Sequence, residues 1–326
     1  MEREIAVAGS SSGTGKPTLP AGGAPLALQA DRTPSAGKPL QEAQARPNVR
    51  SRAVRRFLRN RGAVVAFVIL LAWTLVALLG ARITPYDPIE PMGLARQAPS
   101  WEFWFGTDLL GRDVFSRVLV GSQISLQLGL ISVVLGATPG VLLGLFAGYF
   151  GGWVDALISR IMDALLAFPS ILLALVIIAS LGPSLRNVMI AVGIATVPQY
   201  ARLVRGSVLS IKQLPYVEAA RVVGNPHWRI MTRHVLVNGY APVVVLSTLQ
   251  IGNAILIGSG LSFLGLGAQP PTPEWGLMSA EGRDVLKRAW WISTFPGLAI
   301  LSVVIACNLV GDGLRSALDP RMRVDS

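Results

Sequence analysis

Long stretches without any charged residue are the feature that most restricts how this chain can fold. Six runs contain no Asp, Glu, Lys or Arg: 63–81, 118–154, 164–185, 187–201, 235–273 and 289–311. A helix that crosses the hydrocarbon core of a bilayer needs about 20 apolar residues. Since 52% of the 326 residues are hydrophobic and only 14% are charged, the chain is neither an ordinary soluble domain nor disordered throughout.

The lengths of the runs predict how many times the chain crosses the membrane. Runs 118–154 and 235–273 are too long for a single ~30 Å crossing at ~1.5 Å per residue, so each is either one helix with an extension or two spans. The run 187–201 is short, and we expect it to continue through Arg202 and Arg205, whose side chains can snorkel to lipid headgroups. Each of the other runs fits one helix.

The distribution of charge predicts which side of the membrane each end occupies. Seven arginines and no acid lie from Arg46 to Arg61, and residues 202–233 carry six Lys or Arg against the single acid Glu218. The positive-inside rule places both segments in the cytoplasm. If the run 118–154 crosses once, four crossings separate the two basic segments, and the chain returns to the side on which it started. The sequence therefore predicts an all-α polytopic membrane protein with six transmembrane helices and with cytoplasmic N- and C-termini.

Composition divides the rest of the chain. Residues 1–45 are rich in Gly, Ser, Thr, Pro and Ala, and we expect a disordered cytoplasmic tail without a secretory leader. Residues 46–117 are predicted to hold the basic segment, the first transmembrane helix and an extracytoplasmic segment. A transmembrane core follows over 118–317, with a cytoplasmic loop at 206–234, and residues 318–326 form a cytoplasmic C-terminus.

Four glycines recur at every fourth position of the second predicted span: Gly136, Gly140, Gly144 and Gly148. Residues four apart lie on one face of a helix, and small residues there let two backbones approach closely. We therefore predict a helix–helix interface at this stripe. The sequence does not identify the partner helix.

The loop at 206–234 has the features of two short helices. Pro215 stands where the first turn of a helix would begin, and Gly224 lies just past its end. Asn225 is a candidate cap and Pro226 a candidate first residue of a second helix. Two interpretations stay open: a surface that docks another protein, or an amphipathic segment that lies on anionic lipid.

Four separated motifs give the chain a resemblance to the dipeptide/oligopeptide/nickel branch of binding-protein-dependent ABC transporter permeases. The loop motif comprises Glu218, Ala219, Ala220 and Gly224 and resembles the EAA loop of these permeases. The other three are Phe-Gly-Thr-Asp-Leu-Leu-Gly-Arg-Asp at 105–113, Phe-Leu-Gly-Leu-Gly at 263–267 with Pro-Pro-Thr-Pro-Glu-Trp-Gly at 270–276, and Gly-Asp-Gly-Leu-Arg at 311–315 with Leu-Asp-Pro-Arg at 318–321. The resemblance covers residues 50–323.

The resemblance implies a permease subunit of an ABC importer in a bacterial inner membrane, with half of the translocation pathway for peptides or related small solutes. It implies a heterodimer with a second permease, two cytoplasmic ATPase subunits and an extracytoplasmic solute-binding protein. Glu218, Ala219, Ala220 and Gly224 would couple the chain to an ATPase. The permease itself would not be an enzyme, and we expect no cofactor, metal or nucleic-acid partner.

Two departures from the family pattern stand out. Val237 occupies the position where the loop motif commonly has proline, and Gly-Ser-Gln-Ile-Ser-Leu at 121–126 replaces the common Gly-Ala-Arg-Ile-Ser-Leu. The first affects the junction between the loop and the fifth predicted span. Neither removes the resemblance.

Two other classes of protein remain as alternatives. An ion-coupled secondary transporter needs ionisable residues near the middle of the membrane, but Arg160 and Asp163 stand at helical i,i+3 spacing and are expected to form a local ion pair. An intramembrane enzyme needs a reactive site at membrane depth, whereas both histidines, His227 and His234, lie in the loop.

Polar residues within the predicted spans are candidates for the substrate path. They are Gln250, Asn253 and Ser259, with Asn308 as a further polar position. Ordinary hydrogen bonds between helices, worth about 0.6 kcal/mol on average, are the favoured explanation for each of these residues. The sequence does not choose among dipeptides, longer peptides, nickel chelates and other solutes.

Overall fold

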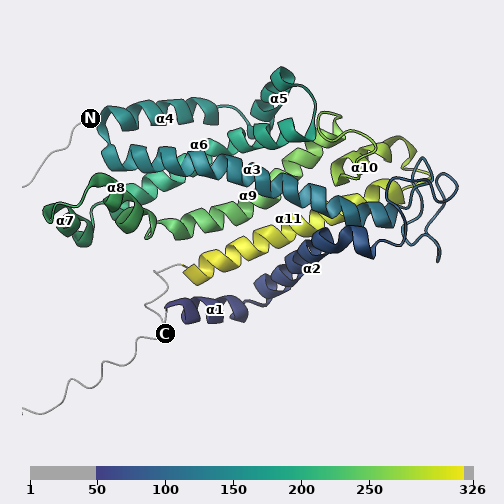
Figure 1. The fold of residues 1–326 in the computed structure, drawn as a ribbon, viewed down its shortest axis with the longest axis horizontal. Coiled ribbons are helices and arrows are strands. Elements are labelled where there is room, and N and C mark those ends of the chain that lie inside the picture. Colours follow the sequence, from purple (N-terminus) through teal and green to yellow (C-terminus); the bar gives the residue numbers. More distant parts are fainter. Residues whose placement is uncertain (1–48, 319–326) are drawn as a thin grey trace, which may run out of the picture. The chain divides into compact units, whose positions relative to one another are not determined.

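The computed structural model describes residues 49–318, and its regular elements there are helices (Figure 1). In chain order they are α1 (Val49–Arg59), α2 (Arg61–Ile83), α3 (Val114–Phe150), α4 (Gly152–Leu166), α5 (Ser170–Leu181), α6 (Leu185–Ile211), α7 (Pro215–Val222), α8 (His227–Arg229), the π-helix η1 (Ile230–Leu236), α9 (Tyr240–Phe263), α10 (Trp275–Glu281), the 3-10 helix η2 (Arg283–Val285) and α11 (Trp291–Leu318). The all-α prediction is confirmed for these residues. The predicted tail at 1–45 and residues 319–326 lie outside them.

Four described helices are long and apolar enough to cross a membrane: α2, α3, α9 and α11. The bent pair α4–α5 raises the number to five if it forms one span. The helix α6 is not among them, since Arg186, Gln199 and Arg202 lower its hydropathy although it is 27 residues long. The two longest charge-free runs each contain a single long helix, α3 and α9, as expected.

The run 164–185, predicted to be one continuous helix, is broken. The helix α4 ends at Leu166, α5 begins at Ser170, and the two axes differ by 91°. Pro169 lies at the break and has an extended backbone. Proline disfavours a helical conformation of the preceding residue, here Phe168, and this provides the physical reason for the correction.

The glycine stripe of α3 packs against α6. A Cβ atom at Gly140 would lie 2.5 Å from the Tyr200 Cβ and 2.7 Å from the Val197 carbonyl oxygen, and one at Gly148 would lie 2.8 Å from the Val208 Cβ. The predicted close interface is therefore confirmed, and its partner is α6. Figure 1 shows the two helices running side by side.

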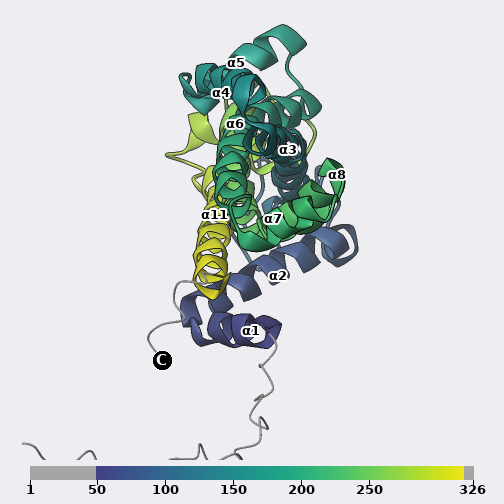
Figure 2. The ribbon, with the colours of Figure 1, turned by 90° about the vertical axis from the view of Figure 1, so that its left-hand side faces the viewer.

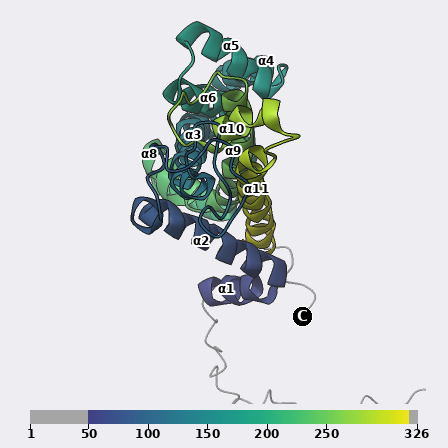
Figure 3. The same cartoon turned by 90° about the vertical axis from the view of Figure 1, so that its right-hand side faces the viewer.

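The described bundle has two distinct ends. The connection between α6 and α9, residues 212–239, holds α7, α8 and η1 at one end, which we call the α7 end (Figure 2). Residues 84–113 and 264–290 lie at the opposite end with α10, the α10 end, where α10 packs on α9 and α11 (Figure 3). Because α6 continues to Ile211, the connection begins six residues later than the predicted loop boundary at 206.

Candidate coupling surface and transport path

The helix α7 forms where the sequence predicted it. Pro215 is its first residue, where its missing N–H group leaves no bond unmade, and Gly224 follows its end with φ of +84°. A side chain at position 224 would meet nothing within 4 Å, so the positive φ and not a lack of space favours glycine. The predicted glycine turn between the two loop helices is confirmed.

The second loop element differs from the prediction. Pro226 and not Asn225 caps α8, and the Asn225 Nδ2 instead donates a hydrogen bond to the Ala220 carbonyl oxygen at the end of α7. The helix α8 has only three residues and continues into η1. Bonds from i to i+5 widen this turn, so Ile230 and Val235, five residues apart, are both buried in the core.

The two faces of α7 have different surroundings. Val217 and Ala220 are buried against Leu145 of α3 and Val204 of α6 in one apolar cluster. On the other face, Glu218, Ala219 and Gly224 are exposed. Three of the four predicted coupling positions therefore lie on the accessible surface, whereas Ala220 helps to fix α7 to the bundle.

Large apolar side chains accompany the exposed coupling positions. Val222 is 87% exposed, Val223 81% and Trp228 65%. Arg221, Arg229 and Arg233 are also exposed in this part of the chain. We call the exposed residues of this surface, from Glu218 to Trp228, the coupling face.

Two acidic residues of α4 pair with α6, which corrects one expectation. Asp163 pairs with Arg202 at 2.7 Å and not with Arg160. Asp155 accepts two hydrogen bonds from Arg205, of which the Nη2–Oδ2 bond is 2.7 Å long. Arg202 and Arg205 therefore find their counter-charges on a neighbouring helix, which the sequence alone does not reveal, and need not reach lipid headgroups to be paired.

Two of the polar path candidates form a network at the contact of α6 with α9. The Gln250 Nε2 donates to the Gln199 Oε1 at 2.7 Å, and the Asn253 Nδ2 donates to the Gln250 Oε1 at 3.3 Å. Gln250 is 5% exposed. Sequence reasoning missed Gln199, because nothing in a linear sequence indicates that it lies opposite Gln250.

Ser259 and Asn308 have other surroundings. The Ser259 Oγ donates to the Glu274 Oε1 at 3.2 Å, and the Asn308 Nδ2 donates to the Val304 carbonyl oxygen within its own helix. Glu274 is fully buried and accepts hydrogen bonds from the N–H groups of Gly276 and Leu277, which cap α10. Burial raises the pKa of Glu274 above its ordinary value, while these donors oppose the shift. Ser259 therefore supports the α10 end.

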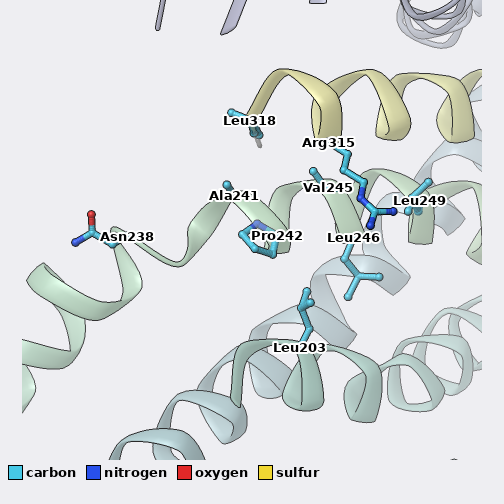
Figure 4. A pocket seen from close by; sticks show the side chains of 9 residues that line it. All are labelled: Leu203, Asn238, Ala241, Pro242, Val245, Leu246, Leu249, Arg315 and Leu318. Carbon is cyan, nitrogen blue, oxygen red and sulfur yellow. The ribbon is translucent and has the colours of Figure 1, made fainter. Parts of the chain in front are cut away.

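A groove of about 520 Å³ opens between α6, α9 and α11 (Figure 4). Its wall is mainly apolar and includes Leu203, Leu246 and Leu249, and Arg315 reaches from α11 toward α9 (Figure 4). Gln250 follows Leu249 directly in the chain. The polar network and the groove are therefore adjacent along α9.

A buried cluster of charges at the α10 end was missed by the sequence reasoning. Arg117 is fully buried, and its Nη2 lies 3.1 Å from the Glu281 Oε2 and its Nη1 3.5 Å from the Asp108 Oδ2. Arg112 pairs with the same two acids. Asp108 and Arg112 lie in one non-helical turn of the motif at 105–113, where the helical i,i+4 rule gives no signal, and no sequence pattern points to Glu281.

Together, these features define the class: an all-helical, multi-pass membrane component with a groove between its helices. In the described residues, no group of three His, Cys, Asp or Glu side chains is placed to hold a metal ion. The description "Binding-protein-dependent transport system inner membrane component" matches residues 140–324. The description "N-terminal TM domain of oligopeptide transport permease C" matches residues 50–99.

Curated relatives cover most of the chain. The dipeptide transport system permease protein DppC of Alkalihalophilus pseudofirmus is 45% identical over 272 residues, which cover 83% of this chain and 90% of that protein. The di/tripeptide transport system permease protein DppC of Pseudomonas aeruginosa is 46% identical, with coverage of 82% and 90%. The glutathione transport system permease protein GsiD of Escherichia coli is 49% identical, with coverage of 82% and 89%.

One solved structure, titled "Crystal structure of an amino acid ABC transporter with histidines", aligns with a TM-score of 0.48 at 16% identity and covers 64% of this chain and 94% of that chain. The family assignment rests on the matches described above. The chain belongs to the family of binding-protein-dependent transport system inner membrane components. It is a multi-pass inner-membrane permease subunit of an ABC importer, and such a system also contains an ATPase, a binding protein and a paired permease. This membership sets aside the secondary transporter and the intramembrane enzyme.

Proposed function

We propose that the coupling face binds an ATPase subunit, and that the chain forms half of a pathway for short peptides. The observation that carries the first part is the exposure of Val222 and Val223 beside Glu218 on a helix whose opposite face is buried. Exposed apolar side chains that are rimmed by charge mark a surface for another protein. Glu218 is the acid of this basic surface and would set the orientation of the partner.

The proposed assembly contains two different permeases, two ATPase subunits and an extracytoplasmic binding protein. The six crossings would be α2, α3, the bent pair α4–α5, α6, α9 and α11, with both termini and the α7 end in the cytoplasm. The basic residues of 202–233 support this orientation under the positive-inside rule. The division into a tail at 1–45, a segment at 46–117, a core at 118–317 and a C-terminus at 318–326 follows the same topology.

Short peptides are the proposed substrates. The relatives are named for dipeptides, for di/tripeptides and for glutathione. The candidate path residues are Gln250 and Asn253, together with Gln199, because their amides form a polar network beside the groove. Amide groups can both donate to and accept from a peptide backbone. Ser259 is less suited, since it is buried and bonded to Glu274.

The docking proposal is tested by placing a charge on the coupling face. In the complete transporter, Val222→Asp should release the ATPase subunits during purification, because it puts a carboxylate into an apolar contact. Val237→Asp is the matched control, since this valine is 58% exposed in the turn before α9. Retention of the ATPases by both variants would show that the coupling face does not bind them.

Labelling tests the topology. In a Cys307→Ala background, Asn225→Cys should resist an impermeant thiol reagent added outside intact cells, whereas Trp101→Cys at the α10 end should react. Trp101 is 97% exposed, so burial does not protect it. Reaction at position 225 from outside would reverse the orientation and remove the basis for ATPase docking.

Transport by the reconstituted complex tests the substrate class. We expect uptake of a labelled dipeptide that depends on ATP and the binding protein, and Gln250→Ala should lower it without loss of the ATPases. Thr248→Ala is the control on the same helix, since its hydroxyl is exposed and bonds only within α9. If no short peptide is taken up or stimulates ATP hydrolysis, the substrate proposal is wrong.

A further inference from the structure

The C-terminal turn of α3 receives three contacts from the chain around α7. The Lys212 Nζ donates a hydrogen bond of 2.8 Å to the Gly148 carbonyl oxygen. The Tyr149 hydroxyl and the His227 Nδ1 are hydrogen-bonded at 2.8 Å, and the Arg221 guanidinium carbon lies 5.7 Å from the centroid of the Tyr149 ring. Residues before, within and after α7 therefore converge on one turn of α3.

Tyr149 differs from the other residues in this contact. Its side chain is only 6% exposed and belongs to the same apolar cluster as Val217 of α7 and Ile230 of η1. Apolar packing has no directional preference, so it permits small sliding movements of the loop on α3. A hydrogen bond between a buried tyrosine and a histidine fixes both distance and direction. The Tyr149–His227 bond is therefore suited to hold the loop in one register.

The helix α3 can carry a displacement across the whole bundle. It is continuous from Val114 to Phe150, 37 residues, or about 55 Å at ~1.5 Å per residue. Its N-terminus is capped by Asp113, and its first turns carry Arg117 of the buried charge cluster at the α10 end. The backbone reverses directly after α3, where Gly151 has φ of +68°.

We propose that Tyr149 is a positioning residue that, through His227, transmits the movement of the coupling face to α3 and so to the α10 end. This inference rests on the proposed binding of an ATPase to the coupling face. Tyr149 is buried beneath the coupling face and contacts it through His227 and Arg221. It fixes the loop that bears this face to the helix that reaches the other end of the bundle.

The test uses the complete transporter, with both permeases, the ATPases and the binding protein in liposomes. The variants are Tyr149→Phe, His227→Ala, their combination and His227→Asn, whose amide occupies a place close to the Nδ1 position. Tyr240→Phe is the matched control, because this tyrosine is exposed at the start of α9. The measurements are ATPase retention, ATP turnover and labelled dipeptide uptake.

We expect Tyr149→Phe and His227→Ala to retain the ATPases and to lower the uptake per ATP hydrolysed by about fivefold or more, within the usual range of coupling between two sites. The double variant should be no worse than either single one, because both remove the same bond. His227→Asn should recover most of the ratio, and Tyr240→Phe should not change it.

Three results would overturn the inference: an unchanged uptake per ATP in Tyr149→Phe, losses that multiply in the double variant, or loss of the ATPases from Tyr149→Phe. The proposed docking is judged separately by Val222→Asp. If that variant loses the ATPases while Tyr149→Phe has the uptake per ATP of the unmodified protein, docking at the coupling face is supported and the role of Tyr149 is refuted. If Val222→Asp retains the ATPases, the docking proposal is wrong, and the inference about Tyr149 loses its basis.

Discussion

The two ends of the bundle differ in whether they bury charged residues. At the α10 end, Arg112, Arg117 and Asp108 are buried and paired with one another or with Glu281. At the α7 end, Glu218, Arg221, Arg229 and Arg233 are exposed, and so are large apolar side chains such as Val222. The α10 end also has exposed apolar side chains, Trp101 among them, so the difference between the two ends lies in the buried charge cluster.

The difference follows from what each arrangement requires. A buried charge is strongly unfavourable unless a partner is held at the right distance, so the α10 cluster needs all its members in one folded unit. Exposed charges need no such partner, and an exposed apolar face gains stability when another protein covers it. The buried cluster is therefore sensitive to changes within the chain, whereas the coupling face is sensitive to its partners.

The largest expected effect comes from breaking the buried cluster. Arg117→Met should destabilise the protein by about 3–5 kcal/mol, because it leaves buried carboxylates with fewer counter-charges. Thermal unfolding of the purified protein in detergent measures the loss. Arg283→Met is the control, since its pair with Asp284 is exposed and such pairs contribute about 0–1 kcal/mol. Equal effects of the two variants would contradict the distinction between the ends.

The glycine stripe packs α3 against α6, and its disruption is next in size. Gly140→Ala should destabilise by about 1–3 kcal/mol, because the new methyl group would meet Tyr200 and the Val197 carbonyl oxygen. Gly206→Ala in α6 meets nothing within 4 Å and should stabilise the helix by about 0.5–1 kcal/mol. Opposite signs in thermal unfolding would confirm the interface, and a stabilising Gly140→Ala would refute it.

A smaller, local effect is expected at the loop turn. Gly224→Val should strain the left-handed backbone by about 1–2 kcal/mol, since φ is +84° and no contact compensates. Hydrogen exchange of α7 should increase, while that of α10 should not. Faster hydrogen exchange in both α7 and α10 would contradict the expectation that the strain stays local to the loop turn.

The smallest effect should come from Val237, which stands where related loops commonly have proline. Its φ of −63° already suits proline, and its side chain is 58% exposed. We expect Val237→Pro to change stability by less than about 1 kcal/mol and to leave uptake unchanged. A large loss of uptake would mean that the junction before α9 has to move during transport.

Local patterns in the sequence anticipated the elements that depend on neighbouring residues. The runs without charge predicted α2, α3, α9 and α11, Pro215 and Gly224 predicted the bounds of α7, and the glycine spacing of α3 predicted a close interface. The broken run at 164–185 was predicted as continuous, although Pro169 signalled a break. Apolar composition makes this stretch hydrophobic, but proline restricts the backbone of the residue before it and so decides where the helix breaks.

The sequence by itself determined where apolar helices form, since helix length, proline and glycine act over a few residues. Only the tertiary structure decided which helix faces which: α6 as the partner of the α3 glycines, Arg202 as the partner of Asp163, and Glu281 as the partner of Arg117. Arg117 and Glu281 lie 164 residues apart in the chain. Contacts at that separation depend on how all the intervening helices pack together, and no local spacing encodes them.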